Sequence, residues 1–170
     1  GSISQQEIND IIVDRARNKK IVVRLKGGDP GIFGRAAEEL DVLAKANIDF
    51  EIVPGITAGI AAAEYAGIML TDREQASQVV FVTGKEAAGK TESSIDWNWL
   101  GRFDGTIVFY MGVESLGTIA SRLIENGKAD TTPTAVIENA TYPAQKIAKA
   151  PLGQIAEKCA RGKIAPPAII

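Results

Sequence analysis

Two short apolar runs that end in glycine-containing loops constrain the fold of this chain most strongly. Residues 21–25 run into Gly27-Gly28-Asp29-Pro30, and residues 50–53 run into Pro54-Gly55. Such runs, closed by glycine and proline, are typical of strands, and a helical pattern of apolar residues follows each loop. Alternating strands and helices favour an α/β fold with a parallel sheet, in which ligands bind at the carboxyl ends of strands. The sequence therefore predicts a ligand site at these loops.

The other regular elements are predicted from helix caps and from periodicity. Ser4-Gln5-Gln6-Glu7 has the form of a capping box and predicts the start of a helix. Further helices are expected at 36–44, 57–65, 116–124 and 152–159, and further strands at 79–83, 106–110, 134–137, 146–148 and 168–170. The polar stretch 71–77 is the best linker candidate. We expect a partial N-terminal α/β lobe over residues 3–72 and a complete C-terminal α/β lobe over 73–170.

Composition excludes several classes of chemistry. The chain has no histidine and a single cysteine, Cys159, so the usual zinc sites, an intramolecular disulfide and Ser/His or Cys/His catalytic pairs are not available. Its 19 basic and 21 acidic residues are spread along the sequence and give no electrostatic footprint for nucleic acid. No apolar run is long enough for a membrane span and no signal-peptide pattern occurs. We expect a cytoplasmic protein that binds a small molecule, with no nucleic-acid or membrane partner.

Each candidate ligand residue also has a purely structural interpretation. Gly27 and Gly28 could let the backbone approach a ligand while Asp29 accepts hydrogen bonds from hydroxyl or ammonium groups. Taken alone, the same residues are more often a tight turn whose aspartate caps the next helix. Thr57 can be an N-cap, and Met111 can be core packing at a strand end.

A set of short motifs occurs through the chain in one order and at close spacing. These are Arg24–Pro30, Ile32-Phe33-Gly34-Arg35, Glu38-Glu39-Leu40, Val53–Thr57, Val82-Thr83-Gly84, Trp97–Leu100, Gly105–Gly112, and Glu138–Thr141 followed by Gln145. Together they resemble the uroporphyrinogen-III C-methyltransferase family of tetrapyrrole methyltransferases over nearly the whole chain. The run Ile32–Arg35 favours that family over relatives that methylate later corrin precursors.

The resemblance implies a two-lobed α/β fold with a partial N-terminal parallel-sheet lobe and a complete C-terminal mixed-sheet lobe. It also implies that S-adenosyl-L-methionine binds in the cleft between the lobes. The matching cofactor positions are Gly27, Gly28, Asp29, Ile32, Thr57, Ala58, Met111 and Ala140. Arg35, and more weakly Lys85, would orient the substrate carboxylates; a solvent-facing charge or a local salt bridge is the alternative for each.

The resemblance implies transfer of two methyl groups to uroporphyrinogen III, giving precorrin-2, from which sirohaem or cobalamin is made. It also implies that the protein is a homodimer. The family's opening Gly-x-Gly-Pro-Gly-Asp loop does not precede Ile3. We therefore expect an N-terminally truncated, inactive chain and assign no catalytic residue. Departures from the family are Gly31 in place of a bulky residue, Lys85 in place of histidine and Ala140 in place of glycine. The alternatives are a methyltransferase of a later corrin precursor and a non-catalytic binding or dimerisation lobe.

Overall fold

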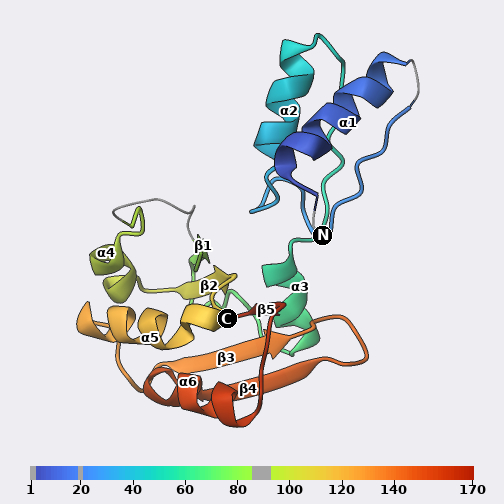
Figure 1. Cartoon of the computed structure of the whole chain (residues 1–170). Helices are drawn as coiled ribbons and strands as arrows, with labels where there is room; N and C mark the ends of the chain where they lie inside the picture. The colour runs from blue at the N-terminus through green and yellow to red at the C-terminus, as the bar shows by residue number, and fades with distance from the viewer. Residues whose placement is uncertain (1–2, 19–20, 86–92) are drawn as a thin grey trace. The chain divides into compact units, whose positions relative to one another are not determined.

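The computed structural model describes residues 3–18, 21–85 and 93–170, which form two compact units (Figure 1). Unit 1 comprises residues 1–57 and unit 2 comprises residues 58–170. The division falls before helix α3 (Ala58–Tyr65), because α3 contacts strands of unit 2. The lobe boundary expected near residue 72 stays a prediction.

Unit 1 contains two helices that pack on each other, α1 (Gln5–Arg17) and α2 (Ala36–Lys45). The capping box predicted for α1 is confirmed. The Glu7 amide donates to Ser4 Oγ at 3.2 Å, and the Ser4 amide donates to Glu7 Oε2 at 2.7 Å. Two of the free amides at the start of the helix are thus satisfied reciprocally.

A buried carboxylate on α2 organises the interior of unit 1. Glu39 is 4% exposed and accepts hydrogen bonds from Lys26 Nζ at 3.0 Å, Arg24 Nε at 3.1 Å and Gln5 Nε2 at 3.2 Å. Burial alone would raise the pKa of Glu39, but the hydrogen bonds from Lys26, Gln5 and Arg24 and the charge of Lys26 lower it overall. Glu39 therefore links α1 and α2 to the segment that precedes the first glycine loop.

The prediction of two strands in unit 1 is wrong for the residues that the structure describes. Residues 21–25 and 50–53 belong to no β-ladder among the described residues, so no parallel sheet is seen in this unit. Their side chains are largely exposed, with Ile21 at 97%, Leu25 at 84% and Val53 at 72%. An apolar sequence favours extended backbone, but a strand needs a neighbour to satisfy its amides and cover its side chains.

Unit 2 is built on a mixed sheet, as the resemblance implied (Figure 1). Its elements after α3 are β1 (Val79–Thr83), α4 (Trp97–Arg102), β2 (Thr106–Tyr110), a 3₁₀ turn η1 (Val113–Ser115), α5 (Leu116–Glu125), β3 (Pro133–Glu138), β4 (Lys146–Pro151), α6 (Leu152–Arg161) and β5 (Ala168–Ile169). The strand order is β1-β2-β5-β3-β4. β1 and β2 are parallel, and the other neighbours are antiparallel. The five strands predicted in this unit are confirmed to within a few residues at their ends.

The core of unit 2 lies between one face of the sheet and the helices α4, α5 and α6. Its largest fully buried side chains are Phe109, Leu100, Ile155 and Val136. Side chains alternate along β2, so Phe109 faces this core while Val108 faces α3 on the other side. In the part of the chain that the structure describes, no helix combines the length and apolarity that a membrane crossing needs.

Candidate functional site

The Asp29 carboxylate joins the two glycine loops of unit 1. Asp29 Oδ1 accepts a hydrogen bond from the Gly31 amide at 2.8 Å, and Oδ2 accepts one from the Gly55 amide at 3.1 Å. The interpretation of Asp29 as a helix cap is wrong, because α2 begins after Arg35 and has no side-chain cap. The structure thus brings together two loops that are 26 residues apart in sequence.

The glycines at this junction allow a close approach of backbone to backbone. A Cβ atom on Gly55 would lie 2.4 Å from the Gly28 carbonyl oxygen, so no side chain fits there. A Cβ on Gly27 would meet nothing within 4 Å. Gly27 and Gly28 are both exposed, and their peptide groups are therefore accessible to a ligand.

Two further predicted residues lie in or beside the same loops. Ile32 is half-buried, and its amide donates to the Asp29 carbonyl at 3.3 Å. Thr57 is 6% exposed and directly precedes α3. Gly27, Gly28, Asp29 and Ile32 thus form one local group in unit 1, with Thr57 two residues beyond Gly55.

In unit 2, the carboxyl ends of three strands meet at one edge of the sheet. β5 is antiparallel to both β2 and β3, so β2 and β3 run in the same direction, and β1 is parallel to β2. Gly84 follows β1, Met111 follows β2, and Asn139-Ala140 follow β3. The Gly84 amide donates to the Tyr110 carbonyl at 2.7 Å, which ties the first two loops together. This edge is where ligands bind in sheets of this class.

Three of the seven described residues other than glycine that have a positive φ lie at the same edge. Met111, Asn139 and Thr141 have positive φ angles of 54°, 48° and 74°. Left-handed backbone costs a residue other than glycine roughly 1–2 kcal/mol, and such strain is concentrated at functional sites. Ala140 is not among these residues, so alanine replaces the family's glycine there without strain of this kind. Met111 is 51% exposed, and its interpretation as core packing is therefore wrong.

Tyr110 and Gly59 form a contact that the sequence did not indicate. Tyr110 is 7% exposed, and its hydroxyl accepts a hydrogen bond from the Gly59 amide at 2.9 Å, which fixes the start of α3 next to the exposed Ala58. A Cβ on Gly59 would lie 2.5 Å from that hydroxyl. A glycine inside an alanine-rich helix was the available signal, because glycine costs a helix about 1 kcal/mol relative to alanine.

Of the two predicted substrate cations, Arg35 is held in a local ion pair, whereas Lys85 forms hydrogen bonds through its backbone. Arg35 makes a bidentate ion pair with Glu38, with Nε–Oε1 at 2.7 Å and Nη2–Oε2 at 2.8 Å, and these hydrogen bonds lower the pKa of Glu38. The Lys85 amide donates to Thr83 Oγ1 at 3.2 Å, and the residue is exposed. Arg35 therefore has the local salt bridge of its alternative interpretation, and its role toward a substrate stays a prediction.

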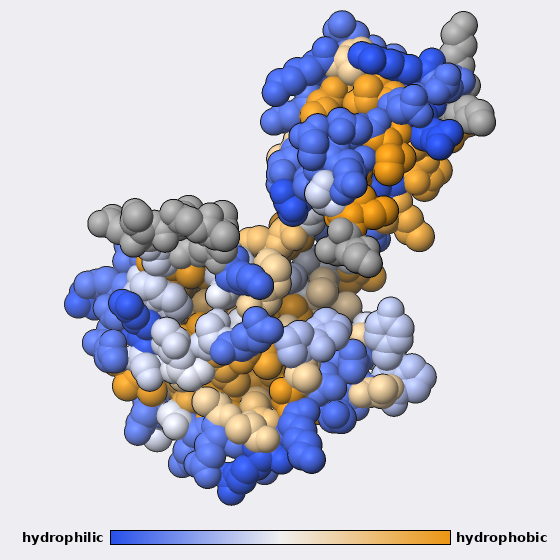
Figure 2. All heavy atoms as spheres, viewed as in Figure 1, coloured by the Kyte–Doolittle hydropathy of each residue, from blue (hydrophilic) through white to orange (hydrophobic). Residues whose placement is uncertain are grey.

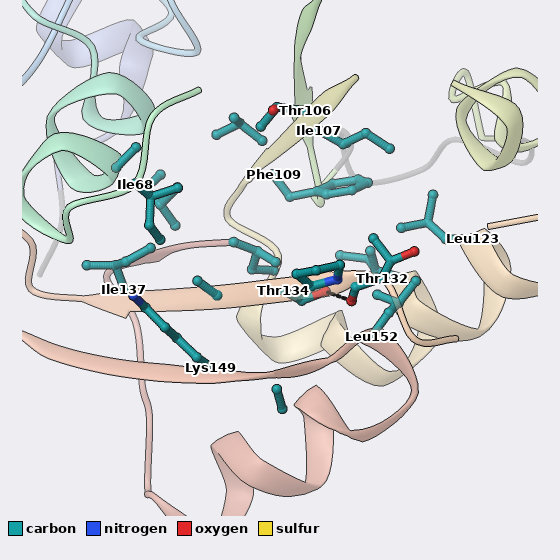
Figure 3. Close-up of a pocket in the computed structure, with 18 of the residues that line it drawn as sticks. Ile68, Thr106, Ile107, Phe109, Leu123, Thr132, Thr134, Ile137, Lys149 and Leu152 are labelled. Atoms are coloured by element: carbon teal, nitrogen blue, oxygen red, sulfur yellow. Dashed lines mark hydrogen bonds between the residues drawn. The ribbon is translucent and has the colours of Figure 1, made fainter. Parts of the chain in front are cut away.

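A cavity of about 690 Å³ lies within unit 2 (Figure 3). Apolar side chains from β2, β3 and α5 form part of its lining, among them Ile107, Phe109, Leu123 and Ile137. None of the positions predicted to bind the cofactor is among the described residues that line it.

Comparison with known proteins places these features in a family. Residues 2–156 match the family described as Tetrapyrrole (Corrin/Porphyrin) Methylases. The chain is 49% identical over 168 residues to an S-adenosyl-L-methionine-dependent uroporphyrinogen III methyltransferase of Methanosarcina barkeri, covering 99% of this chain and 66% of that protein. It is 45% identical over 168 residues to a uroporphyrinogen-III C-methyltransferase of Bacillus subtilis, covering 99% of this chain and 35% of that protein.

Solved structures agree with this match. The uroporphyrin-III C-methyltransferase of Thermus thermophilus complexed with S-adenyl homocysteine is 33% identical, with a TM-score of 0.79 over 97% of this chain and 71% of that one. A cobalt precorrin-4 methyltransferase from cobalamin biosynthesis is 27% identical, with a TM-score of 0.88 over 99% of this chain and 70% of that one. The chain belongs to the tetrapyrrole (corrin/porphyrin) methylase family.

Proposed function

We propose that the protein containing this chain transfers two methyl groups from S-adenosyl-L-methionine to uroporphyrinogen III, giving precorrin-2. The observation that carries the proposal is the 49% identity, over 99% of this chain, to the Methanosarcina barkeri uroporphyrinogen III methyltransferase. Cobalt precorrin-4 methyltransferase has the higher TM-score but only 27% identity. A TM-score measures similarity of fold, whereas sequence identity bears more directly on the substrate. Methylation of a later corrin precursor is therefore the second candidate.

The loops of unit 1 fit the polar part of the cofactor. A carboxylate has about four acceptor positions, and Asp29 uses one on each oxygen for Gly31 and Gly55. The remaining positions accept hydrogen bonds from ribose hydroxyls or from an ammonium group. The exposed peptide groups of Gly27 and Gly28 provide further contacts at the same place. In this proposal Ile32 and Thr57 complete the group.

Unit 2 contributes apolar contacts in the same proposal. Met111 presents a half-exposed, polarizable side chain on a strained backbone, which suits contact with an adenine ring or a thioether. Ala58 and Ala140 are small and leave room at the ends of α3 and β3. The bound sulfonium supplies an activated methyl group, so the protein needs no nucleophile of its own and works by holding the reactants in line.

Arg35 is the proposed contact for substrate carboxylates. Its planar guanidinium already binds one carboxylate, that of Glu38, in the bidentate geometry that a carboxylated tetrapyrrole would use.

We assign no catalytic residue, and we propose that the longer protein is needed for turnover, since this chain spans 66% and 35% of the two curated relatives. We also propose that the longer protein is a cytoplasmic homodimer and that its product is used to make sirohaem or cobalamin. A monomer in light scattering of the longer protein would contradict the dimer.

The experiment uses the longer natural protein and labelled S-adenosyl-L-methionine. We expect uroporphyrinogen III to gain two methyl groups by mass spectrometry and a later corrin precursor to gain none. Methylation of the corrin precursor alone would favour the second candidate. No transfer to either substrate, in a protein that binds the cofactor, would favour a non-catalytic lobe.

A variant at Asp29 tests the cofactor site separately. We expect Asp29→Ala to weaken binding of S-adenosyl homocysteine by roughly 1–3 kcal/mol, the scale of a hydrogen bond to a charged group. Asp29→Asn should lose less because one acceptor oxygen remains. Asp41→Ala, at an exposed position on α2, is the matched control. An unchanged dissociation constant for Asp29→Ala in calorimetry would remove this residue from the site.

A further inference from the structure

Tyr110 lies where three segments of unit 2 meet. It is the last residue of β2 and directly precedes Met111. Its carbonyl accepts a hydrogen bond from the Gly84 amide at 2.7 Å, and its hydroxyl accepts one from the Gly59 amide at 2.9 Å. This residue thus joins the end of β2 to the loop after β1 and to the first turn of α3.

The sheet fixes the position of the Tyr110 ring. Side chains alternate along β2, which places Tyr110 and Val108 on the α3 side of the sheet. The ring packs edge-on against Phe81 of β1, with the ring centres 5.9 Å apart and the two planes at 83°. Tyr110 is 7% exposed, so its ring has little freedom to move. The hydroxyl is therefore held at one place on this side of the sheet.

The Tyr110 hydroxyl provides the acceptor for a buried helix amide. Gly59 is the second residue of α3, and the amides of the first turn have no acceptor inside their own helix. Because Gly59 is buried, its amide needs a partner from the protein. Without the hydroxyl, this amide would lose its hydrogen bond unless the start of α3 moved.

Glycine at position 59 makes this bond possible. A Cβ atom on Gly59 would lie 2.5 Å from the Tyr110 hydroxyl and 2.9 Å from Val108 Cγ1. A larger residue would therefore push the start of α3 away from β2. Gly59 and Tyr110 together set how closely α3 approaches the sheet.

The same bond sets the relative positions of two proposed cofactor contacts. Ala58 directly precedes Gly59 and is exposed, and Met111 directly follows Tyr110 and is 51% exposed. The path from Ala58 to Met111 consists of two peptide links, the Tyr110 side chain and one hydrogen bond. A change at the hydroxyl would therefore move one contact relative to the other.

We propose that Tyr110 is a positioning residue for the cofactor, which holds the start of α3 through Gly59 and does not itself contact the cofactor. The inference rests on the proposed function, because it takes Ala58 and Met111 as contacts for S-adenosyl-L-methionine. The methyl group must be held in line with the carbon that attacks it, so a shift of one contact should lower both cofactor affinity and rate. A tyrosine that served only the core would affect stability alone.

The experiment uses the longer natural protein and the variant Tyr110→Phe, which removes the hydroxyl and keeps the ring. We expect this variant to bind S-adenosyl homocysteine about tenfold more weakly, the factor that corresponds to one lost hydrogen bond. The KM for S-adenosyl-L-methionine should rise, whereas the KM for uroporphyrinogen III should not change. Tyr65→Phe, the same substitution at the exposed end of α3, is the matched control and should change neither.

A second substitution tests whether Tyr110 acts through Gly59. In the unmodified protein, Gly59→Ala adds a methyl group 2.5 Å from the hydroxyl and should weaken binding of S-adenosyl homocysteine by more than Tyr110→Phe does. In Tyr110→Phe that oxygen is gone, so the added Gly59→Ala should weaken binding by a smaller factor. If the two factors simply multiply, the residues act independently and the proposal is wrong.

Hydrogen exchange of the unmodified protein gives a measurement that does not depend on a variant folding. If cofactor binding is coupled to the start of α3, S-adenosyl homocysteine should slow exchange of the Gly59 amide by a larger factor than that of the Ala62 amide, later in the same helix. Equal factors at both amides would contradict the coupling.

Three further outcomes separate this inference from the proposed function. If Tyr110→Phe unfolds at lower urea concentration but keeps its affinity for S-adenosyl homocysteine and its KM values, Tyr110 serves only the core and the inference is wrong. If the unmodified protein binds S-adenosyl homocysteine but does not methylate uroporphyrinogen III, only the proposed function is wrong. If it binds no S-adenosyl homocysteine, both are wrong.

Discussion

Units 1 and 2 carry the same kind of apolar run, but only unit 2 pairs such runs into a sheet. Residues 21–25 have the composition of a strand, yet Ile21 is 97% exposed, whereas Val136 in β3 is fully buried. Helices form in both units because their hydrogen bonds are local. Strands depend on partners that are distant in sequence, so an apolar run specifies a strand only where the rest of the sheet is present.

The two units also differ in what holds them together. The centre of unit 1 is an ionic cluster, in which Glu39 pairs with Arg24 and Lys26. Unit 2 has a continuous apolar core that includes Leu100, Phe109 and Ile155. We expect the stability of unit 1 to depend on pH, and the stability of unit 2 to fall when buried side chains are made smaller.

The largest expected difference between the units is in amide exchange. We expect amides at 108–110, inside the sheet, to exchange at least about a thousandfold more slowly than those at 21–25, because unpaired backbone opens with little free-energy cost. Hydrogen exchange followed by NMR measures both segments in one sample. Equal or stronger protection at 21–25 would mean that this run is paired in solution and would remove the contrast.

A pair of isoleucine substitutions tests the same contrast through packing. Ile155 is fully buried on α6, and Ile155→Ala should lower the free energy of unfolding by about 2–5 kcal/mol, through lost burial and a residual cavity. Ile21→Ala, at a 97% exposed side chain, should change it by less than about 0.5 kcal/mol. Urea unfolding followed by circular dichroism measures both variants. A large loss for Ile21→Ala would indicate that Ile21 is covered in solution.

Local signals predicted much of this fold from the sequence. The capping box at Ser4 and the helix end at Gly127, with its φ of 110°, depend on neighbouring residues and are found as expected. The strand 106–110 is also found, because unit 2 contains strands that pair with it. The strand prediction for residues 21–25 is wrong because their composition contains no information on whether a partner strand is available. Helix α4, preceded by Asp96 as its N-cap, is not predicted by the sequence, because six residues show too little periodicity.

The candidate site was predictable in part, for a related reason. Family motifs pointed to Asp29 and Met111, but composition could not show that Asp29 joins two loops or that Met111 has a left-handed backbone. The bond between Tyr110 and Gly59 spans 51 residues; the glycine within a helix marks Gly59 as unusual, but a single sequence does not show that Tyr110 is its partner. Those contacts join segments that are distant in sequence, and they are visible only in three dimensions.

We expect unit 1 to unfold in acid before unit 2 does. Glu39 has a folded pKa below its ordinary value of about 4.3, so its stabilisation is complete above that value and is lost as pH falls through the folded pKa. We expect helical circular dichroism from α1 and α2 to fall in this acid range before the fluorescence of Trp97 and Trp99 reports unfolding of unit 2. Glu39→Gln should remove this early transition. The same pH profile in both proteins would show that Glu39 does not hold unit 1 together.

The smallest expected effects are at the helix N-caps, where the two units should behave alike. Ser4 Oγ accepts from the Glu7 amide in unit 1, and Asp96 Oδ1 accepts from the Trp99 amide at 2.9 Å in unit 2. Ser4→Ala and Asp96→Ala should each cost about 1 kcal/mol in urea unfolding, because each leaves a helix amide without its acceptor. Ser121→Ala, at an exposed position within α5, is the control and should change little.

Glycine at the cap separates a local capping effect from a wider loss of structure. Ser4→Gly should cost only a few tenths of a kcal/mol, because glycine leaves the first amides open to water. If Ser4→Ala and Ser4→Gly both cost nothing while Asp96→Ala costs about 1 kcal/mol, the first turn of α1 is not stably formed in solution. The contrast between the units would then extend from their strands to their helices, and the view that helices form in unit 1 on local signals alone would be wrong.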